Sequence, residues 1–122
     1  MPTEPDPITL SEIARRATEI VDPNGADDDV VRLFTQLEDD DAPITAVQNL
    51  EERLALAEEG ADIEGDNPAV AMSVALILYL AHRRDELEDD ADEVLRLAAR
   101  SEWKGQPPAA VQTWLEERGV TV

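Results

Sequence analysis

An uncharged stretch from Asn67 to His82 constrains the fold more than any other part of this sequence. It reads NPAVAMSVALILYLAH, and Ser73 is the single polar residue between Ala69 and Ala81. Apolar side chains occupy every side of a helical wheel drawn for this stretch, which predicts a helix buried on all sides. Asn67 followed by Pro68 predicts its start, because Asn caps free N–H groups and Pro at the first helical position lacks a donor that would be unpaired anyway.

The length of this stretch predicts a core helix and not a membrane span. At about 1.5 Å per residue it reaches about 24 Å, whereas a membrane-spanning helix needs about 20 apolar residues. We therefore expect a central apolar helix over about 68–84 and no membrane partner.

Helical signals also mark the segments on both sides. Thr9 to Glu12 forms a capping-box pattern, and apolar residues then recur at helical spacing. Asp90 to Glu93 forms a second such pattern, so we expect the chain to break between Asp85 and Asp90, although neither Gly nor Pro occurs there. The remaining helices are expected over about 10–21, 27–37, 43–60, 91–104 and 108–118.

These signals predict an all-α protein. We expect a compact bundle of five or six short helices around the central apolar helix. Residues 1–8, with three prolines, should form a disordered leader, residues 9–119 a single helical domain, and residues 120–122 a tail.

The charge balance is strongly acidic. Twenty-nine acidic residues face ten basic ones, which gives a net charge of −19, and Lys104 is the single lysine. This composition resembles that of cytoplasmic proteins from salt-loving archaea. The physical reason is that molar salt reduces the screening length to about 3 Å, so that repulsion among carboxylates costs little.

The cellular location follows from two further features. The chain contains no cysteine, and its start, MPTEPDPITL, lacks the basic head and apolar run of a signal peptide. We therefore expect a cytoplasmic protein.

The distribution of charge indicates a possible contact surface. Residues 94–122 carry four basic residues against three glutamates, and they form the one long segment outside the central stretch that is not acidic. In a chain otherwise coated with carboxylates, such a segment is a candidate for partner contact. Together with the end of the central helix, it supplies the predicted contact residues, Arg83, Arg84, Arg96, Arg100, Trp103 and Lys104.

Two known kinds of site fit the sequence poorly. The segment from Asp22 to Leu33 is similar to an EF-hand calcium loop, but Asp27 stands where that loop needs glycine, and Leu33 where it needs glutamate. The aspartates are better explained as helix caps. TLSEIARRA, from residue 9, resembles the first helix of a helix-turn-helix, but the next helix would open with three aspartates facing the phosphates.

The sequence offers no catalytic constellation, cofactor motif or metal-ligand set. The single histidine, His82, is followed by Asp85 and Glu86, and it fits a partner for the helix dipole better than a general base. We therefore expect a non-enzymatic protein–protein interaction or regulatory module that binds a protein partner or associates with itself, for example as a homodimer. The alternatives are a nucleic-acid-binding regulator that uses the basic C-terminal third and, third, a small-molecule or metal-dependent enzyme.

Overall fold

The computed structural model describes residues 8–38, 49–63, 67–83 and 89–120. Within these residues the secondary structure consists of six α-helices without strands, which confirms the predicted all-α class. The helices are α1 (Leu10–Val21), α2 (Asp28–Leu37), α3 (Leu50–Gly60), α4 (Pro68–His82), α5 (Ala91–Trp103) and α6 (Ala109–Glu117).

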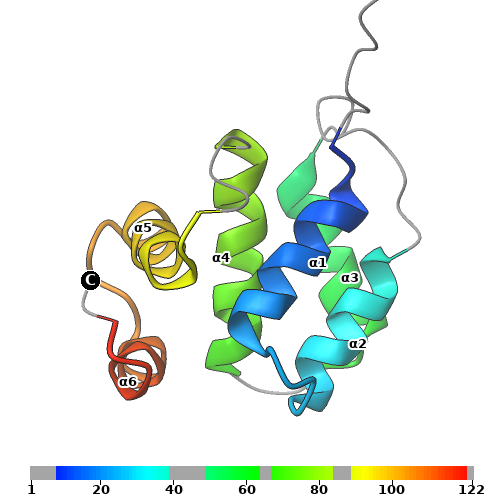
Figure 1. Ribbon diagram of the computed structural model, residues 1–122. Helices are drawn as coiled ribbons and strands as arrows, with labels where there is room; N and C mark the ends of the chain where they lie inside the picture. Colours follow the sequence, from blue (N-terminus) through cyan, green and yellow to red (C-terminus); the bar gives the residue numbers. More distant parts are fainter. Residues whose placement is uncertain (1–7, 39–48, 64–66, 84–88, 121–122) are drawn as a thin grey trace, which may run out of the picture.

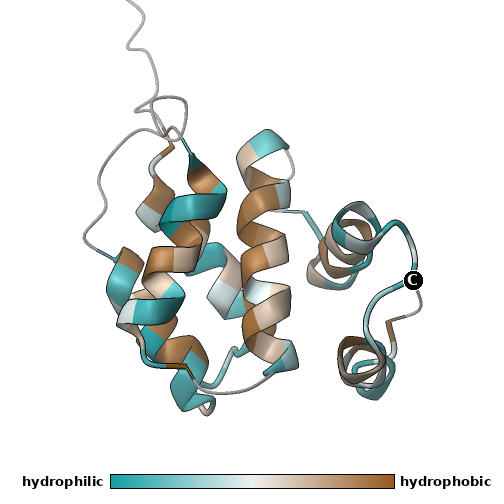
Figure 2. Cartoon of the chain, turned by 180° about the vertical axis from the view of Figure 1, so that it is seen from behind, coloured by the Kyte–Doolittle hydropathy of each residue, from teal (hydrophilic) through white to brown (hydrophobic). Residues whose placement is uncertain are grey.

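Helix α4 lies at the centre of the bundle, as predicted (Figure 1). Helices α1, α2 and α3 pack on one side of it, and α5 and α6 pack on the other. In Figure 1, α4 is seen from the side, whereas α5 and α6 are seen almost along their axes, so these two helices cross α4. Figure 2 shows that α4 is apolar along its length, while α1 and α2 each have a polar and an apolar side.

Side-chain caps fix the beginnings of α1, α4 and α5, as the sequence predicts. The Thr9 hydroxyl accepts a hydrogen bond from the backbone N–H of Glu12 at 3.2 Å, and Asp90 accepts one from Glu93 at 3.2 Å. The Asn67 side chain accepts from the N–H of Ala69 at 2.9 Å, directly before Pro68. Each cap satisfies a donor that has no partner within its own helix, which explains why the starts were predictable.

The centre of the core is formed by α4. Met72, Leu76, Ile77 and Leu80 are all inaccessible to solvent. Ser73 is equally buried, and its hydroxyl donates to the carbonyl oxygen of Ala69 at 2.8 Å, so its polar atom is satisfied within the same helix. The other buried apolar side chains come from all the remaining helices, which agrees with a helix enclosed by its neighbours.

Two boundaries differ from the predicted ones. Helix α3 begins at Leu50, because Asn49 adopts the left-handed conformation with φ of 56°. The prediction of one continuous helix over 43–60 is therefore wrong at Asn49. Asn enters this region more readily than other non-glycine residues. Helix α4 ends at His82, because Arg83 leaves the helical conformation with φ of −122° and ψ of 61°.

Helices α4 and α5 are separate, because the chain leaves the helical conformation at Arg83 and α5 begins after the Asp90 cap; most of the predicted break between Asp85 and Asp90 lies outside the described residues. Arg84 and the residues to position 88 lie outside the described part of the chain, as do residues 43–48. The packed core extends to Ile8, which is half-buried, and to Val120, which is 4% exposed.

Candidate interaction site

One side of α4 is left partly uncovered. Ala71, Val74, Leu78 and Tyr79 are half-buried, whereas the other apolar residues between Ala69 and Ala81 are buried. These four residues follow the spacing i, i+3, i+7 and i+8, so they form a single stripe along the helix. The sequence could not reveal this stripe, because every side of α4 is apolar.

A cavity of about 430 Å³ opens at the N-terminal end of the stripe. Its lining is largely apolar and comes from the end of α3, the start of α4 and the start of α6. Ile63, Ala71 and Val111 contribute aliphatic surface, and Pro108 adds a rigid rim. Among the described residues that line this cavity, Glu58 of α3 is the one with an ionisable side chain. Burial raises the pKa of the Glu58 carboxyl above its usual value of 4.5.

A second cavity, of about 410 Å³, opens at the C-terminal end of the stripe. Leu78 and Tyr79 of α4 form its apolar part, together with Ala75 and Ala98. Its polar residues are Glu51 of α3, His82 and Arg83 at the end of α4, and Ser101 and Glu102 of α5. We call the two cavities, together with the stripe of half-buried α4 residues that extends from one to the other, the α4 groove.

Helix α3 forms one wall of this groove. Glu51, near its start, lines the second cavity, and Glu58, near its end, lines the first, so α3 runs antiparallel to α4. The opposite wall comes from α5 at one end and from α6 at the other. The groove therefore has an apolar floor and a wall with two carboxylates.

The structure brings together some of the predicted contact residues. Arg83 lines the second cavity beside the C-terminal end of α5. Arg96, Arg100 and Trp103 follow one another at i, i+4 and i+7 on α5, and Arg100 is exposed. Lys104 is exposed at the C-terminal cap of this helix, and Arg84 lies outside the described residues.

Structural contacts account for part of this set. Arg96 forms an ion pair with Glu93 one turn earlier, and this pairing raises the pKa of Arg96. Trp103 is half-buried against the core. Trp114 is 7% exposed and lies in the core, as predicted, with the Arg118 guanidinium 3.5 Å from its ring centroid.

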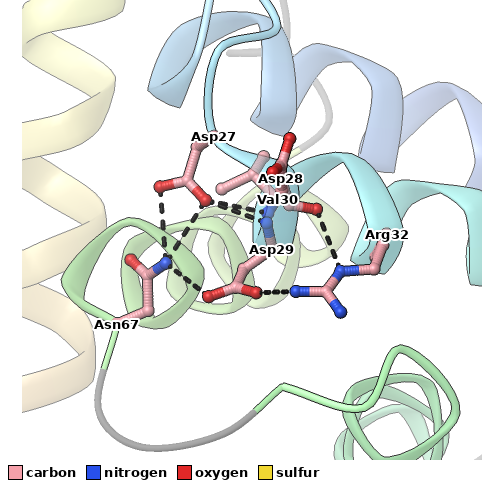
Figure 3. A network of polar contacts seen from close by, with 6 residues as sticks. All are labelled: Asp27, Asp28, Asp29, Val30, Arg32 and Asn67. Carbon is pink, nitrogen blue, oxygen red and sulfur yellow. Dashed lines mark hydrogen bonds and ion pairs between the residues drawn. The ribbon is translucent and has the colours of Figure 1, made fainter.

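Of the three aspartates at residues 27–29, Asp27 acts as the helix cap (Figure 3). Asp27 accepts hydrogen bonds from the N–H groups of Asp29 and Val30 at the start of α2. The side-chain amide of Asn67 donates to Asp27 at 3.3 Å and to Asp29 at 3.0 Å, so one residue links the beginnings of α2 and α4. This bond lowers the pKa of Asp29, and Arg32 lowers it further.

Other kinds of site were searched among the described residues. No group of three or more His, Asp or Glu side chains there could hold a metal ion, and none of the described helices has the length and hydropathy that a bilayer span requires. Of the two arginines in the helix-turn-helix-like segment, Arg15 is exposed, and Arg16 donates to the carbonyl oxygen of Asp89 at 3.1 Å.

Comparison of the chain with protein-family models, curated proteins and solved structures finds no match. The α4 groove is therefore the feature of the molecule from which a function can be proposed. Sequence reasoning missed its acidic wall, although the seven-residue spacing of Glu51 and Glu58 places both on one side of a helix.

Proposed function

We propose that this protein is a non-enzymatic protein–protein interaction or regulatory module that docks a protein partner in the α4 groove. The observation that supports this proposal is the half-buried apolar stripe of Ala71, Val74, Leu78 and Tyr79, which has an open cavity at each end. Partly exposed apolar surface between polar walls is typical of sites where proteins bind one another.

A second copy of the chain is one such partner, which makes a homodimer part of this proposal. The proposed setting is the cytoplasm of a cell with high internal salt, since 29 acidic residues face 10 basic ones. In that setting, helical circular dichroism should rise with KCl. Equal helicity in dilute buffer would argue against adaptation to salt.

We prefer this proposal to the nucleic-acid alternative. Arg96 is paired with Glu93, and Glu102 and Arg83 both line the second cavity. Carboxylates therefore lie among the basic residues that would bind phosphate groups, and they would repel a nucleic acid. Binding of DNA or RNA at the salt concentration that folds the protein, reduced when Arg96, Arg100 and Lys104 become Ala, would reverse this preference.

The test compares two Leu→Glu variants in molar KCl. Leu78→Glu places a charge on the groove floor, and Leu56→Glu places the same charge on the outer surface of α3, where Leu56 is 59% exposed. Light scattering after size exclusion measures self-association, and affinity capture from a cell extract measures partner binding. We expect Leu78→Glu to lose the complex and Leu56→Glu to keep it.

Circular dichroism establishes that both variants are folded. Ala71→Gln, a smaller change at the other end of the stripe, repeats the test if Leu78→Glu unfolds. A wild-type protein that stays monomeric and captures no partner, or a complex that survives both groove substitutions, would contradict the proposal.

A further inference from the structure

The groove that carries the proposed function has an uneven charge distribution. Glu51 and Glu58 lie on the α3 wall, and Glu102 lies on the α5 wall, whereas Arg83 is the one Arg or Lys among the described residues that line the two cavities. Glu51 and Glu58 are seven residues apart, which corresponds to two turns and about 10 Å along α3. An occupant therefore meets apolar side chains on the floor and carboxylates along one side.

Glu58 is the residue that most limits the choice of occupant. Its carboxylate is half-buried beside Ile63, Ala71 and Val111, and within the described residues no hydrogen bond or ion pair reaches it. Removing a carboxylate from water without a partner costs free energy, and this cost appears here as a raised pKa. A cation that enters the cavity would offset the cost, whereas an anion would increase it.

The extent of the two cavities and the stripe along α4 favours a helix over a small ligand. Its α4 residues extend from Asn67 to Arg83, which corresponds to about 24 Å at 1.5 Å per residue. A helix of about 16 residues spans this length, and its apolar side chains can meet the stripe with the same i, i+3, i+7 spacing. A small organic cation would fill one cavity and leave the rest of the stripe uncovered.

We infer that the α4 groove binds a basic amphipathic helix of a partner protein. Its apolar side packs on Ala71, Val74 and Leu78, and its Lys or Arg side chains, two turns apart, pair with Glu58 and Glu51. This inference rests on the proposed function and adds the chemistry of the partner.

The test uses three synthetic probes. The first is a helical peptide of about 16 residues with a leucine stripe and with lysines two turns apart on its flank. The second carries glutamates in place of these lysines, and the third probe is spermidine, a polycation without apolar side chains. Fluorescence anisotropy of the labelled lysine peptide measures its binding to the whole protein, and the other two probes are tested as competitors.

Removing either wall carboxylate should weaken binding of the lysine peptide, and the two losses should differ in size and in salt dependence. Glu58→Gln should weaken binding of the lysine peptide about tenfold, because a half-buried charge pair is lost. Glu51→Gln should weaken it about threefold at the lowest KCl concentration that keeps the protein folded, and this effect should disappear near 1 M KCl, since Glu51 is exposed. The Glu58 effect should persist at both salt concentrations.

Glu19→Gln is the matched control, because Glu19 is exposed on α1 and does not line either cavity. It should leave binding unchanged. A nuclear magnetic resonance titration of Glu58 provides an independent readout, and peptide binding should lower the pKa of this carboxyl toward its usual range.

Three results would overturn the inference. They are the absence of binding by the lysine peptide, equal binding of the glutamate peptide, and complete competition by spermidine at concentrations similar to those of the peptide. None of these affects the proposed function, which fails separately if the wild-type protein neither associates with itself nor captures a partner through Leu78.

Discussion

Asn67 performs two tasks at once, and substitution can separate them. Its side-chain oxygen caps α4 through the N–H of Ala69, and its amide nitrogen donates to the carboxylates of Asp27 and Asp29. Asn67→Asp keeps an acceptor for the cap but replaces the donor with a third carboxylate. Asn67→Ala removes both the cap and the bridge, and adds no charge.

The structure gives approximate magnitudes for both changes. Loss of an N-cap side chain costs about 1 kcal/mol, and loss of the half-exposed amide bridge to Asp27 and Asp29 costs about 1.5 kcal/mol, the lower end for bonds to charged groups. Asn67→Ala should therefore cost about 2.5 kcal/mol. Asn67→Asp loses the bridge only, but repulsion from two nearby carboxylates in a water-like dielectric adds about 2 kcal/mol in dilute salt, for a total of about 3.5 kcal/mol.

Salt should reverse the order of the two variants. Near 1 M KCl the screening length falls to about 3 Å, so most of the added repulsion in Asn67→Asp disappears and a cost of about 1.5 kcal/mol remains. Asn67→Ala should still cost about 2.5 kcal/mol, because its loss does not depend on repulsion.

Urea denaturation followed by circular dichroism, at a low and a high KCl concentration, measures these free energies of unfolding. Asn24→Asp is the control, because it adds the same charge in the exposed turn between α1 and α2. The reasoning is refuted if Asn67→Asp is as stable as the wild type at the lower KCl concentration, or if the two variants keep the same order at both concentrations.

Three further predictions concern single positions. Leu80→Ala should lower the free energy of unfolding by about 2–5 kcal/mol, because Leu80 is fully buried on α4; denaturation by urea measures this loss. Gly119→Ala should lower the free energy of unfolding by about 1 kcal/mol, because Gly119 has φ of 75°, which strains a residue with a Cβ, although no atom lies close enough to clash with it. Asn adopts this conformation more readily than Ala, so a Gly119→Asn variant that is less stable than Gly119→Ala would contradict this explanation. Glu58→Gln should raise the melting temperature at neutral pH, because the folded-state pKa of Glu58 is raised and its carboxylate destabilises the fold once ionised. This gain should shrink as pH falls through the folded-state pKa and vanish below about 4.5, where the carboxyl is protonated in both states; a gain that is independent of pH would be contrary evidence.

Local signals made much of the fold predictable. The caps at Thr9, Asn67 and Asp90 act through bonds to backbone groups two or three residues away, so the sequence around them contains all the information needed. The apolar stretch from Ala69 to Ala81 likewise predicted a buried central helix, because it is apolar on every side and too short to span a membrane.

Two other features were not predicted. The left-handed conformation of Asn49 interrupts a helical pattern that contains no strong breaker, and the crossing of α4 by α5 and α6 depends on side-chain packing. Neither follows from local sequence.

The candidate site was predictable only in part. The sequence indicated basic residues near the end of α4 and on α5, and Arg83 does line the groove. Which side of α4 stays uncovered could not be predicted, because a helix that is apolar on every side has no polar face to mark the side that points to solvent. The role of Glu58 depends on the neighbours that bury it, and these come from α4 and α6.

The central position of α4 restricts how this chain can change in length. Helices α1 and α5 pack on different sides of α4, so both depend on its angular register. One inserted residue within α4 would rotate everything after it by about 100°, and it would turn Leu76 and Leu80 away from their present neighbours. Insertions and deletions should therefore be tolerated in the connections between helices and excluded from the interior of α4, where even a single additional alanine would separate the two halves of the bundle.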